Sequence, residues 1–432
     1  MATPGILGLN ALDARHQHLL ALDSYKNFNS LPCGLPAELW SIILDHLYDN
    51  KRTLLSCLLA CRAWGDFCRY HLYELFTWST VNKFDEDGCS TFHPYPHYAR
   101  RLAISGSLLD DDVAEDSNIE WLLPLAQHLD QFVSVTHLEV DSMDWDDIFR
   151  THAWDKFTSA KGFLSQITCL DFCNIPLHPF QHILESICLF PSLEKLDYLP
   201  SHVDFGEEIF DLQSYTPSSS WHAFSTEHSP LQLPTLGFWT WFSAIEFTSL
   251  QTIRLDSVPT SDLPSLSSYL RLLGGVLKNF RIRFITPHDV YEFVESNVLA
   301  NSTGLQRLEL VGFIRQYPND QFWAGEESFN LLTMLPGTSL SGLDVLLDGT
   351  PHRIADSVLS RLAAIDDILA TSEKFSALNN VHLHLGRCDK VNQEISKAFP
   401  SCQKKGLITV STSMQDLSLI AMTKVILDDG ME

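Results

Sequence analysis

The sequence predicts an α/β protein in two parts, a small three-helix bundle followed by a long array of strand–helix repeats with a parallel inner sheet and outer helices. Apolar residues recur at three- and four-residue steps between residues 31 and 78. A short leucine phrase then returns many times from residue 99 onward. The chain has 432 residues, 45% of them hydrophobic, and is too long to fold around one compact core. We therefore divide it into 1–30, 31–78 and 79–432.

The first two segments are expected to be helical. Residues 9–26 suit one short helix in the N-terminal segment. From residue 31, Pro36 suits a first helical turn and Glu38 favours the positive end of a helix dipole. Three apolar stripes then follow, made of Leu39, Ile42, Ile43 and Leu47, of Leu54, Leu55, Leu58 and Cys61, and of Trp64, Phe67 and Cys68. Three short helices make a small core and leave apolar side chains over, which suggests a partner.

The remaining chain carries a recurring phrase of the form L-x-x-L-x-L. Its copies are 99–104, 135–140, 167–172, 193–198, 250–255, 277–282, 305–310, 340–345 and 378–383. One step between copies is about twice the others, and WHAFST (221–226) falls near its middle as a degenerate copy. Repetition at this period predicts a solenoid.

Amphipathic stretches lie between the phrases. Three examples are Val290, Phe293, Val294 and Val298; Val358, Leu359, Leu362, Ile365 and Leu369; and Phe180, Ile183, Leu184 and Ile187. Each repeat is thus a short strand followed by a helix, which buries its apolar side only by stacking on its neighbours. The proline- and serine-rich stretch 199–235 is expected to be an irregular insertion packed on the array.

Residues 31–78 resemble the F-box family. The resemblance is carried by Leu35, Pro36, Glu38, Leu39, Ile42, Leu47, Leu54, Leu55, Leu58, Cys61, Arg62 and Trp64, in family order and near-family spacing. Ala60, where many members have Val, and Trp40 on the outer side of the first helix depart from the pattern. The match covers about a ninth of the chain.

The resemblance implies a docking module for the Skp adaptor of a cullin–RING ubiquitin ligase. The adaptor-binding residues it implies are Leu35, Pro36, Leu39, Ile42, Leu47, Leu54, Leu58, Cys61 and Trp64. A burial-driven interface needs such apolar anchors at helical spacing. The alternative is that these residues form only the core of an ordinary helical bundle.

The array is similar to the leucine-rich-repeat half of F-box/leucine-rich-repeat proteins, especially the divergent fungal kind. That family usually places Asn or Cys three residues after the last leucine of each phrase, and this chain has neither there. We therefore expect an irregular solenoid.

Composition restricts the partners. There are 54 acidic against 29 basic residues, a formal net charge of −25. Such a balance argues against nucleic acid and anionic membranes, which bind through Lys and Arg. Ten scattered cysteines without disulfide spacing and no secretory or membrane-spanning segment place the expected compartment in the cytosol, the nucleus or both.

No catalytic motif stands out, so we expect neither an enzyme nor a cofactor. The sequence has no nucleophile elbow, phosphate-binding loop, zinc-protease helix or dinucleotide fingerprint. His382 and His384 would share one side of a strand and could share a metal, but no further ligand is placed in sequence to complete a site. Cys57 and Cys61 belong to an apolar stripe, where buried thiols are usual. We therefore expect no metal.

The inner face of the predicted sheet carries a group of arginines. Arg254 and Arg281 fall on consecutive repeats, and Arg283 and Arg307 lie close by. Arginines gathered on one patch favour an acidic or phosphorylated target segment. Alternatively, they pair with Asp256 and Glu309 on neighbouring strands, and this interpretation is favoured because charge alternation on a solvated sheet is common.

Two functions of different class follow. In the first, the chain is a substrate receptor whose helical part docks to the ligase and whose array holds an unknown target protein. In the second, it is a non-catalytic interaction scaffold that is not coupled to ubiquitination. Co-purification with the Skp adaptor distinguishes them.

Overall fold

The computed structural model divides into two compact units, which we describe separately. It describes residues 39, 42–44, 46–48, 50–60, 64–79, 96–106, 122–143, 152–175, 180–200, 211–226, 235–316, 322–323, 326–336, 339–348, 356–384 and 389–411. Unit 1 contains the chain up to Thr77, together with 84–102 and 131–135. Unit 2 contains the rest. The predicted helix at 9–26 lies outside the described residues.

Unit 1 is built around two short helices. They are α3 (Lys51–Ala60) and α4 (Gly65–Leu72), preceded by helical residues 42–44. Asn50 supports the start of α3, because its side chain accepts a hydrogen bond from the Thr53 amide at 3.0 Å. The buried core is formed by Leu44, Leu54, Phe67 and Cys68, with Leu47, Cys57, Leu58, Trp64 and Leu72 partly buried around it. Phe67 and Cys68 point inward as predicted.

Most of the described strands belong to unit 2, where they form a parallel sheet. They are β3 (His137–Asp141), β4 (Cys169–Ile175), β5 (Lys195–Pro200), β6 (Ala223–Thr226), β7 (Thr252–Leu255), β8 (Asn279–Arg283), β9 (Arg307–Gln316), β11 (Gly342–Asp348), β12 (Asn380–His384) and β13 (Ile408–Ser411). Each pairs in parallel with the strands before and after it in this series. Two short strands, β1 (Leu75–Ser79) and β2 (Arg101–Ser105), each have residues assigned to both units. The predicted α/β class with a parallel sheet is confirmed.

One buried residue from each repeat forms a continuous row across the sheet. The strand register joins Leu138, Leu170, Leu196, Phe224, Ile253, Phe280, Leu308, Leu343 and Val381 side by side in this order. Each has at most 1% of its surface exposed. We call this row the core ladder. It confirms that the leucine phrases are adjacent parallel strands and that WHAFST supplies a strand of its own, β6.

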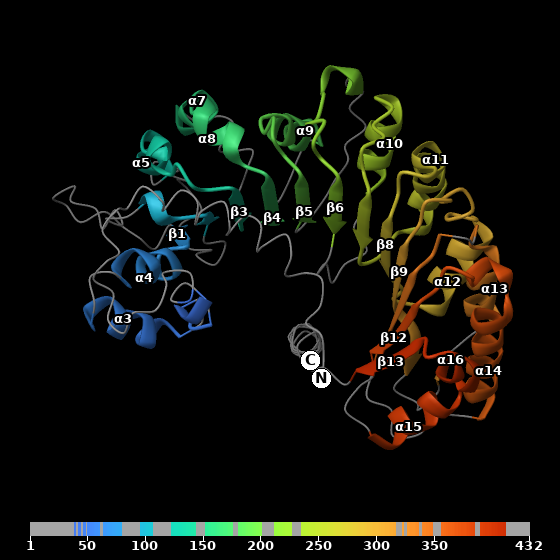
Figure 1. Ribbon diagram of the computed structural model, residues 1–432. Helices are drawn as coiled ribbons and strands as arrows, with labels where there is room; N and C mark the ends of the chain where they lie inside the picture. Colours follow the sequence, from blue (N-terminus) through green and yellow to red (C-terminus); the bar gives the residue numbers. More distant parts are fainter. Residues whose placement is uncertain are drawn as a thin grey trace, which may run out of the picture. The chain divides into compact units, whose positions relative to one another are not determined.

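The helices of unit 2 cover one face of the sheet (Figure 1). They are α5 (Leu122–Gln127), α7 (His152–Ser159), α8 (Lys161–Gln166), α9 (Phe180–Cys188), α10 (Leu236–Ala244), α11 (Leu263–Leu273), α12 (Pro287–Glu295), α13 (Glu326–Met334), α14 (Asp356–Thr371), α15 (Asp389–Lys397) and α16 (Pro400–Lys404). The short 3-10 turns are η5 (Pro96–Tyr98) in unit 1, and η8 (Leu129–Gln131), η9 (Leu212–Ser214), η10 (Thr260–Asp262) and η11 (Glu373–Phe375). The predicted stripes on α9 and α12 are buried. The opposite side of the sheet is covered by none of the described helices, and we call it the helix-free face.

Aromatic side chains fill the core beneath α10. Those fully buried there include Trp221, Phe224, Phe238, Trp239, Trp241, Phe242 and Tyr269. The ring centroids of Trp221 and Phe242 lie 5.3 Å apart, edge to face. Polar ring atoms keep partners, since Trp239 Nε1 donates to Thr235 Oγ1 at 2.7 Å and the Tyr269 hydroxyl donates to the Phe247 carbonyl at 2.8 Å. The predicted insertion 199–235 thus contains η9, β6 and part of this core.

Backbone hydrogen bonds hold the starts of β4 to β9, β11 and β12. The Gln251 carbonyl accepts from the amides of Lys278 and Asn279, at 2.8 and 2.9 Å. The same two-donor pattern recurs at the carbonyls of Thr136, Thr168, Glu194, His222, Lys278, Gln306 and Ser341. These carbonyls, rather than a row of asparagines, join the turns of neighbouring repeats.

Two strands near the end of unit 2 were not predicted. β13 pairs in parallel with β12 although its sequence ITVS lacks the leucine phrase. β10 (Phe322–Trp323) pairs antiparallel with the extended end of β9. Among the described residues, no helix has the length and apolar content that crossing a bilayer requires.

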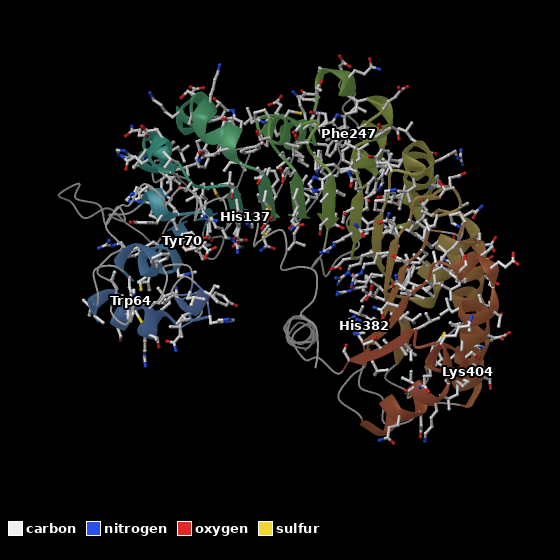
Figure 2. The ribbon with its side chains drawn as sticks, viewed as in Figure 1. Trp64, Tyr70, His137, Phe247, His382 and Lys404 are labelled. Atoms are coloured by element: carbon white, nitrogen blue, oxygen red, sulfur yellow. The ribbon has the colours of Figure 1, made fainter. Side chains whose placement is uncertain are left out.

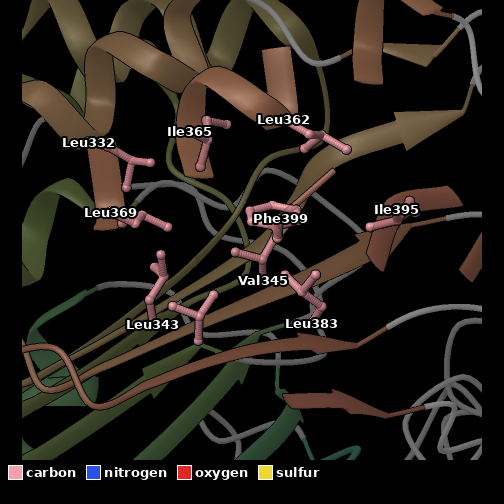
Figure 3. Close-up of a pocket in the computed structure, with 10 residues that line it drawn as sticks. Leu332, Leu343, Val345, Leu362, Ile365, Leu369, Leu383, Ile395 and Phe399 are labelled. Carbon is pink, nitrogen blue, oxygen red and sulfur yellow. The ribbon is translucent and has the colours of Figure 1, made fainter. Parts of the chain in front are cut away.

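The sheet and helices near the C-terminus enclose a small apolar cavity (Figure 3). Its volume is about 10 Å³, roughly the space for one water molecule. Its walls are the side chains of Leu332, Leu343, Val345, Leu362, Ile365, Leu369, Val381, Leu383, Ile395 and Phe399. This cavity is a gap in the packed core and is too small for an organic ligand.

Stability is expected to depend on pH through Asp366. This buried carboxylate on α14 accepts the amides of Ser401 and Cys402 at the start of α16, both at 2.8 Å. Burial raises the pKa of Asp366, but these hydrogen bonds outweigh burial and hold the pKa below its usual range. The folded form therefore gains stability above the unfolded pKa of roughly 3.9 and loses it as pH falls through the lower folded value.

We predict that Asp366→Asn loses about 1–3 kcal/mol of unfolding free energy at pH 7. The difference from the native protein should shrink as pH falls below about 3.9 toward 3, because the carboxyl of the unfolded chain is then protonated while the folded carboxylate stays ionised, so that unfolding takes up a proton. Thermal unfolding of both proteins between pH 7 and 3 measures this. A difference that stays constant with pH would contradict the assignment.

Candidate interaction surfaces

Unit 1 exposes more large apolar side chains than its small core can use. Six of them, with their exposed fractions, are Leu39 (44%), Ile42 (52%), Ile43 (40%), Tyr48 (61%), Leu55 (46%) and Leu59 (87%), and Leu75 (50%) and Val133 (65%) are exposed elsewhere in this unit. Leu55 and Leu59 are four residues apart on α3 and therefore share one side of that helix. All six fall within residues 39–59, and large apolar residues gathered on a surface are typical of interaction sites. We call this set the apolar surface of unit 1.

The predicted adaptor-binding residues fall into three groups. Leu39 and Ile42 belong to the apolar surface, whereas Leu47, Leu58 and Trp64 are partly buried against the core (Figure 2 labels Trp64). Leu54 is fully buried and supports the helices from within. Leu35, Pro36 and Cys61 lie outside the described residues. Leu55, which the sequence pattern placed on the same stripe as Leu54, instead points to solvent.

The helix-free face of unit 2 carries acidic residues on β3 to β5. His137 Nε2 on β3 lies 2.6 Å from Asp171 Oδ2 on β4, and Lys195 pairs with Asp197 within β5. Burial raises the pKa of Asp171, but contacts with His137 and Lys195 outweigh it and hold that pKa below its usual range. Burial raises the pKa of Asp197, and Lys195 only partly offsets it. This part of the face is a network of paired charges.

Two cysteines lie among these acidic groups. Burial, followed by the negative charge of Asp171, raises the pKa of both Cys169 and Cys173 to about 12. Both thiols are therefore protonated at neutral pH, and thiols in that state are poor nucleophiles and poor metal ligands.

The predicted arginine group lies on β7 to β9, and the register brings Arg254 beside Arg281. Arg281 Nη1 lies 3.1 Å from Glu309 Oε1, and Arg283 Nη1 lies 3.6 Å from Asp256 Oδ2. These pairs agree with the alternative interpretation, in which the arginines pair with Asp256 and Glu309 on neighbouring strands. The acidic or phosphorylated target stays a prediction.

A charge swap tests these pairs. We predict that Arg281→Glu lowers the unfolding free energy by about 1 kcal/mol, since two carboxylates then face each other across neighbouring strands. Adding Glu309→Arg to the same chain should restore most of the loss. Chemical denaturation of the single and double variants measures both effects. Equal stability of the native and Arg281→Glu proteins would instead leave Arg281 available for a target.

The strand register completes a group that the sequence left unfinished. Asp344 on β11 lies beside His382 on β12, and His384 is two residues further along the same side. Asp344 is only 3% exposed and accepts from Arg307 through Nε at 2.7 Å and Nη2 at 3.2 Å. Burial raises the pKa of Asp344, but interactions with His384 and Arg307 outweigh burial and lower that pKa. Arg307 is thus committed to Asp344, and the two histidines have a carboxylate beside them.

Comparison with known proteins assigns no family to this chain. No protein-family model matches it, and no curated protein matches it either. A crystal structure of a Bacteroides fragilis protein from a structural genomics programme resembles it with a TM-score of 0.35 at 12% identity. The alignment covers 72% of this chain and 73% of that one. A similarity at this level supplies no argument about function.

Proposed function

We propose that this chain is the substrate-recognition adaptor of a Skp/cullin/F-box ubiquitin ligase. Unit 1 docks to the Skp-type adaptor and, through it, to a cullin–RING ligase. The array of unit 2 binds the protein to be ubiquitinated. The chain itself does no chemistry in this proposal, and the ubiquitin-transferring activity belongs to the ligase.

The observation that carries the proposal is the apolar surface of unit 1. Its residues coincide with the segment whose pattern resembles the F-box, and a buried leucine contributes about 1.5–3 kcal/mol that an exposed one does not. Leu59, with 87% of its surface exposed, gains nothing from the fold of unit 1. A helical partner that covers Leu55, Leu59 and Ile42 would recover this energy, as apolar anchors do in helical interfaces.

The target-binding role rests on the helix-free face of unit 2. The strand side chains that point to this face are acidic on β4 and β5, at Asp171 and Asp197, and basic on β7 and β8, at Arg254 and Arg281. A broad sheet face without covering helices is the surface that repeat proteins use for their partners. Because acidic and basic residues lie at separate places on this face, it favours an extended target that carries the opposite charge at each place.

Co-expression with a Skp-type adaptor tests the proposal. Affinity purification of this chain should recover the adaptor in a 1:1 complex that stays together in size-exclusion chromatography. Addition of a cullin–RING module should then yield a ternary assembly. Failure to recover the adaptor contradicts the proposal. Recovery of the adaptor without the cullin module would favour the scaffold that is not coupled to ubiquitination.

A further inference from the structure

We propose that Asp344, His382 and His384 form a binding site for a divalent transition metal of the Zn²⁺ class on the helix-free face of unit 2. This site is independent of the proposed adaptor function. Asp344 Oδ1 lies 3.6 Å from His382 Nδ1 and 3.7 Å from His384 Nε2. The ring centroids of the two histidines are 3.9 Å apart, and one ligand atom from each residue lies within 4.8 Å of the others. Figure 2 labels His382 at this position.

The distances fit a metal better than a direct hydrogen bond. An N–H···O hydrogen bond is about 2.7–3.2 Å long, so both histidine nitrogens are too far from the carboxylate oxygen to donate to it. A tetrahedral Zn²⁺ with bonds of roughly 2.0–2.1 Å to nitrogen and oxygen separates its ligand atoms by about 3.3 Å. The two separations from Asp344 Oδ1, 3.6 and 3.7 Å, are thus within a few tenths of an ångström of the spacing that a metal imposes, and the two histidine nitrogens lie within 4.8 Å of each other.

Outer contacts already orient two of the three ligands. Ser411 Oγ on β13 lies 3.1 Å from His384 Nδ1, which leaves Nε2 of that ring for the metal. Arg307 grips the Asp344 carboxylate from the other side. Such outer partners fix the orientation of a ligand, although the positive charge of Arg307 also opposes a cation.

The orientation of the His382 ring presents one of its nitrogens to the site. Nδ1 faces Asp344, whereas Nε2 is buried on the far side of the ring and finds no hydrogen-bond partner among the described residues.

Two imidazoles and one carboxylate suit Zn²⁺, Co²⁺ or Ni²⁺ rather than Ca²⁺ or Mg²⁺, which prefer oxygen ligands. Three protein ligands also leave one position open, as in zinc sites that bind water or a substrate group. The side chains of His382 and His384 are 23% and 26% exposed. The open position can therefore be reached from solvent, and water fills it in the isolated protein.

A second cluster of similar composition, His137, Cys169 and Asp171, provides a contrast. Its histidine and carboxylate already hydrogen-bond at 2.6 Å, which leaves no room between them for an ion. Its thiol has a pKa raised to about 12, mainly by burial, so the thiolate that a metal needs is costly. His137 is accordingly the matched control.

The test uses the full chain after removal of metal with a chelator. Titration with Co²⁺, followed by visible absorption, and with Zn²⁺, followed by calorimetry, should each show one site. Replacing both histidines by glutamine (His382→Gln with His384→Gln) should weaken binding more than about 100-fold, beyond the effect of losing an outer partner. The His137→Gln variant should bind like the native chain, because His137 lies in the other cluster.

Thermal unfolding supplies a second measurement that does not depend on the double variant folding well. Zn²⁺ should raise the melting temperature of the native protein and not that of the single variant His384→Gln. The proposal is overturned if the native chain binds neither metal, if the double variant binds as tightly as the native chain, or if His137→Gln abolishes binding.

Discussion

Replacing Leu55 and Leu59 by aspartate should abolish binding of the Skp-type adaptor while unit 1 stays folded. The two side chains are 46% and 87% exposed and lie on one side of α3, so neither supports the core of Leu44, Leu54, Phe67 and Cys68. Each buried anchor lost from an interface costs about 2 kcal/mol or more, and a charge placed in the same site adds a desolvation penalty. Together they weaken the complex by at least about 1,000-fold.

Leu272 and Val276 provide the matched control. They are also exposed apolar residues four positions apart, at 40% and 36%, but they belong to the array in unit 2. The double variant Leu272→Asp with Val276→Asp should retain adaptor binding. Co-purification and size-exclusion chromatography compare the two variants, and circular dichroism confirms that both are folded. Unchanged adaptor binding by a folded Leu55→Asp, Leu59→Asp protein would remove the docking proposal.

Leu308→Ala should destabilise the array by about 2–5 kcal/mol. Leu308 has none of its surface exposed and lies in the core ladder between Phe280 and Leu343, so its removal leaves a cavity bordered by two repeats. Neighbouring strands are held by backbone hydrogen bonds and cannot close that gap without breaking the register. Denaturant unfolding measures the effect.

Gln306→Ala is the control for this substitution. Gln306 is exposed two residues before Leu308, and its backbone carbonyl, which the substitution keeps, makes the contacts to the next repeat. This variant should change the unfolding free energy by less than about 0.5 kcal/mol. A similar small change for Leu308→Ala would mean that the ladder is not the core of the array.

The sequence predicted the array well because one physical requirement repeats in every strand. Leu138, Leu170 and Leu196 each fill the same place in a sheet covered by helices on one face, so the same residue type recurs at the same position of the phrase. The degenerate copy at 221–226 was recognisable because Phe224 fills that place too. β13 was missed because its strand is exposed at Val410 and needs no leucine phrase.

The candidate sites were predicted less completely because they depend on pairs of residues distant in sequence. The pairing of Arg281 with Glu309 was foreseen, since both occupy the same position of consecutive phrases. Asp344 and His382 occupy that same position in the next two phrases, and this signal would have supplied the carboxylate missing from the histidine pair. Metal sites are usually recognised by ligands that are close in sequence, whereas this carboxylate and the two histidines belong to different repeats. Which apolar residues of unit 1 face solvent also depends on packing that an apolar stripe alone does not determine.

The two-donor carbonyls that hold β4 to β9, β11 and β12 have a consequence for how this chain tolerates insertions and deletions. They use only main-chain atoms, so any residue except proline in a donor position satisfies them. The spacing between ladder residues ranges from 26 residues, between Leu170 and Leu196, to 38, between Leu343 and Val381, while the strand register is kept. Length changes are therefore absorbed on the helical side of each repeat. The same main-chain links let side chains on the helix-free face change without altering the strand register, so the proposed target-binding surface can diversify on one architecture.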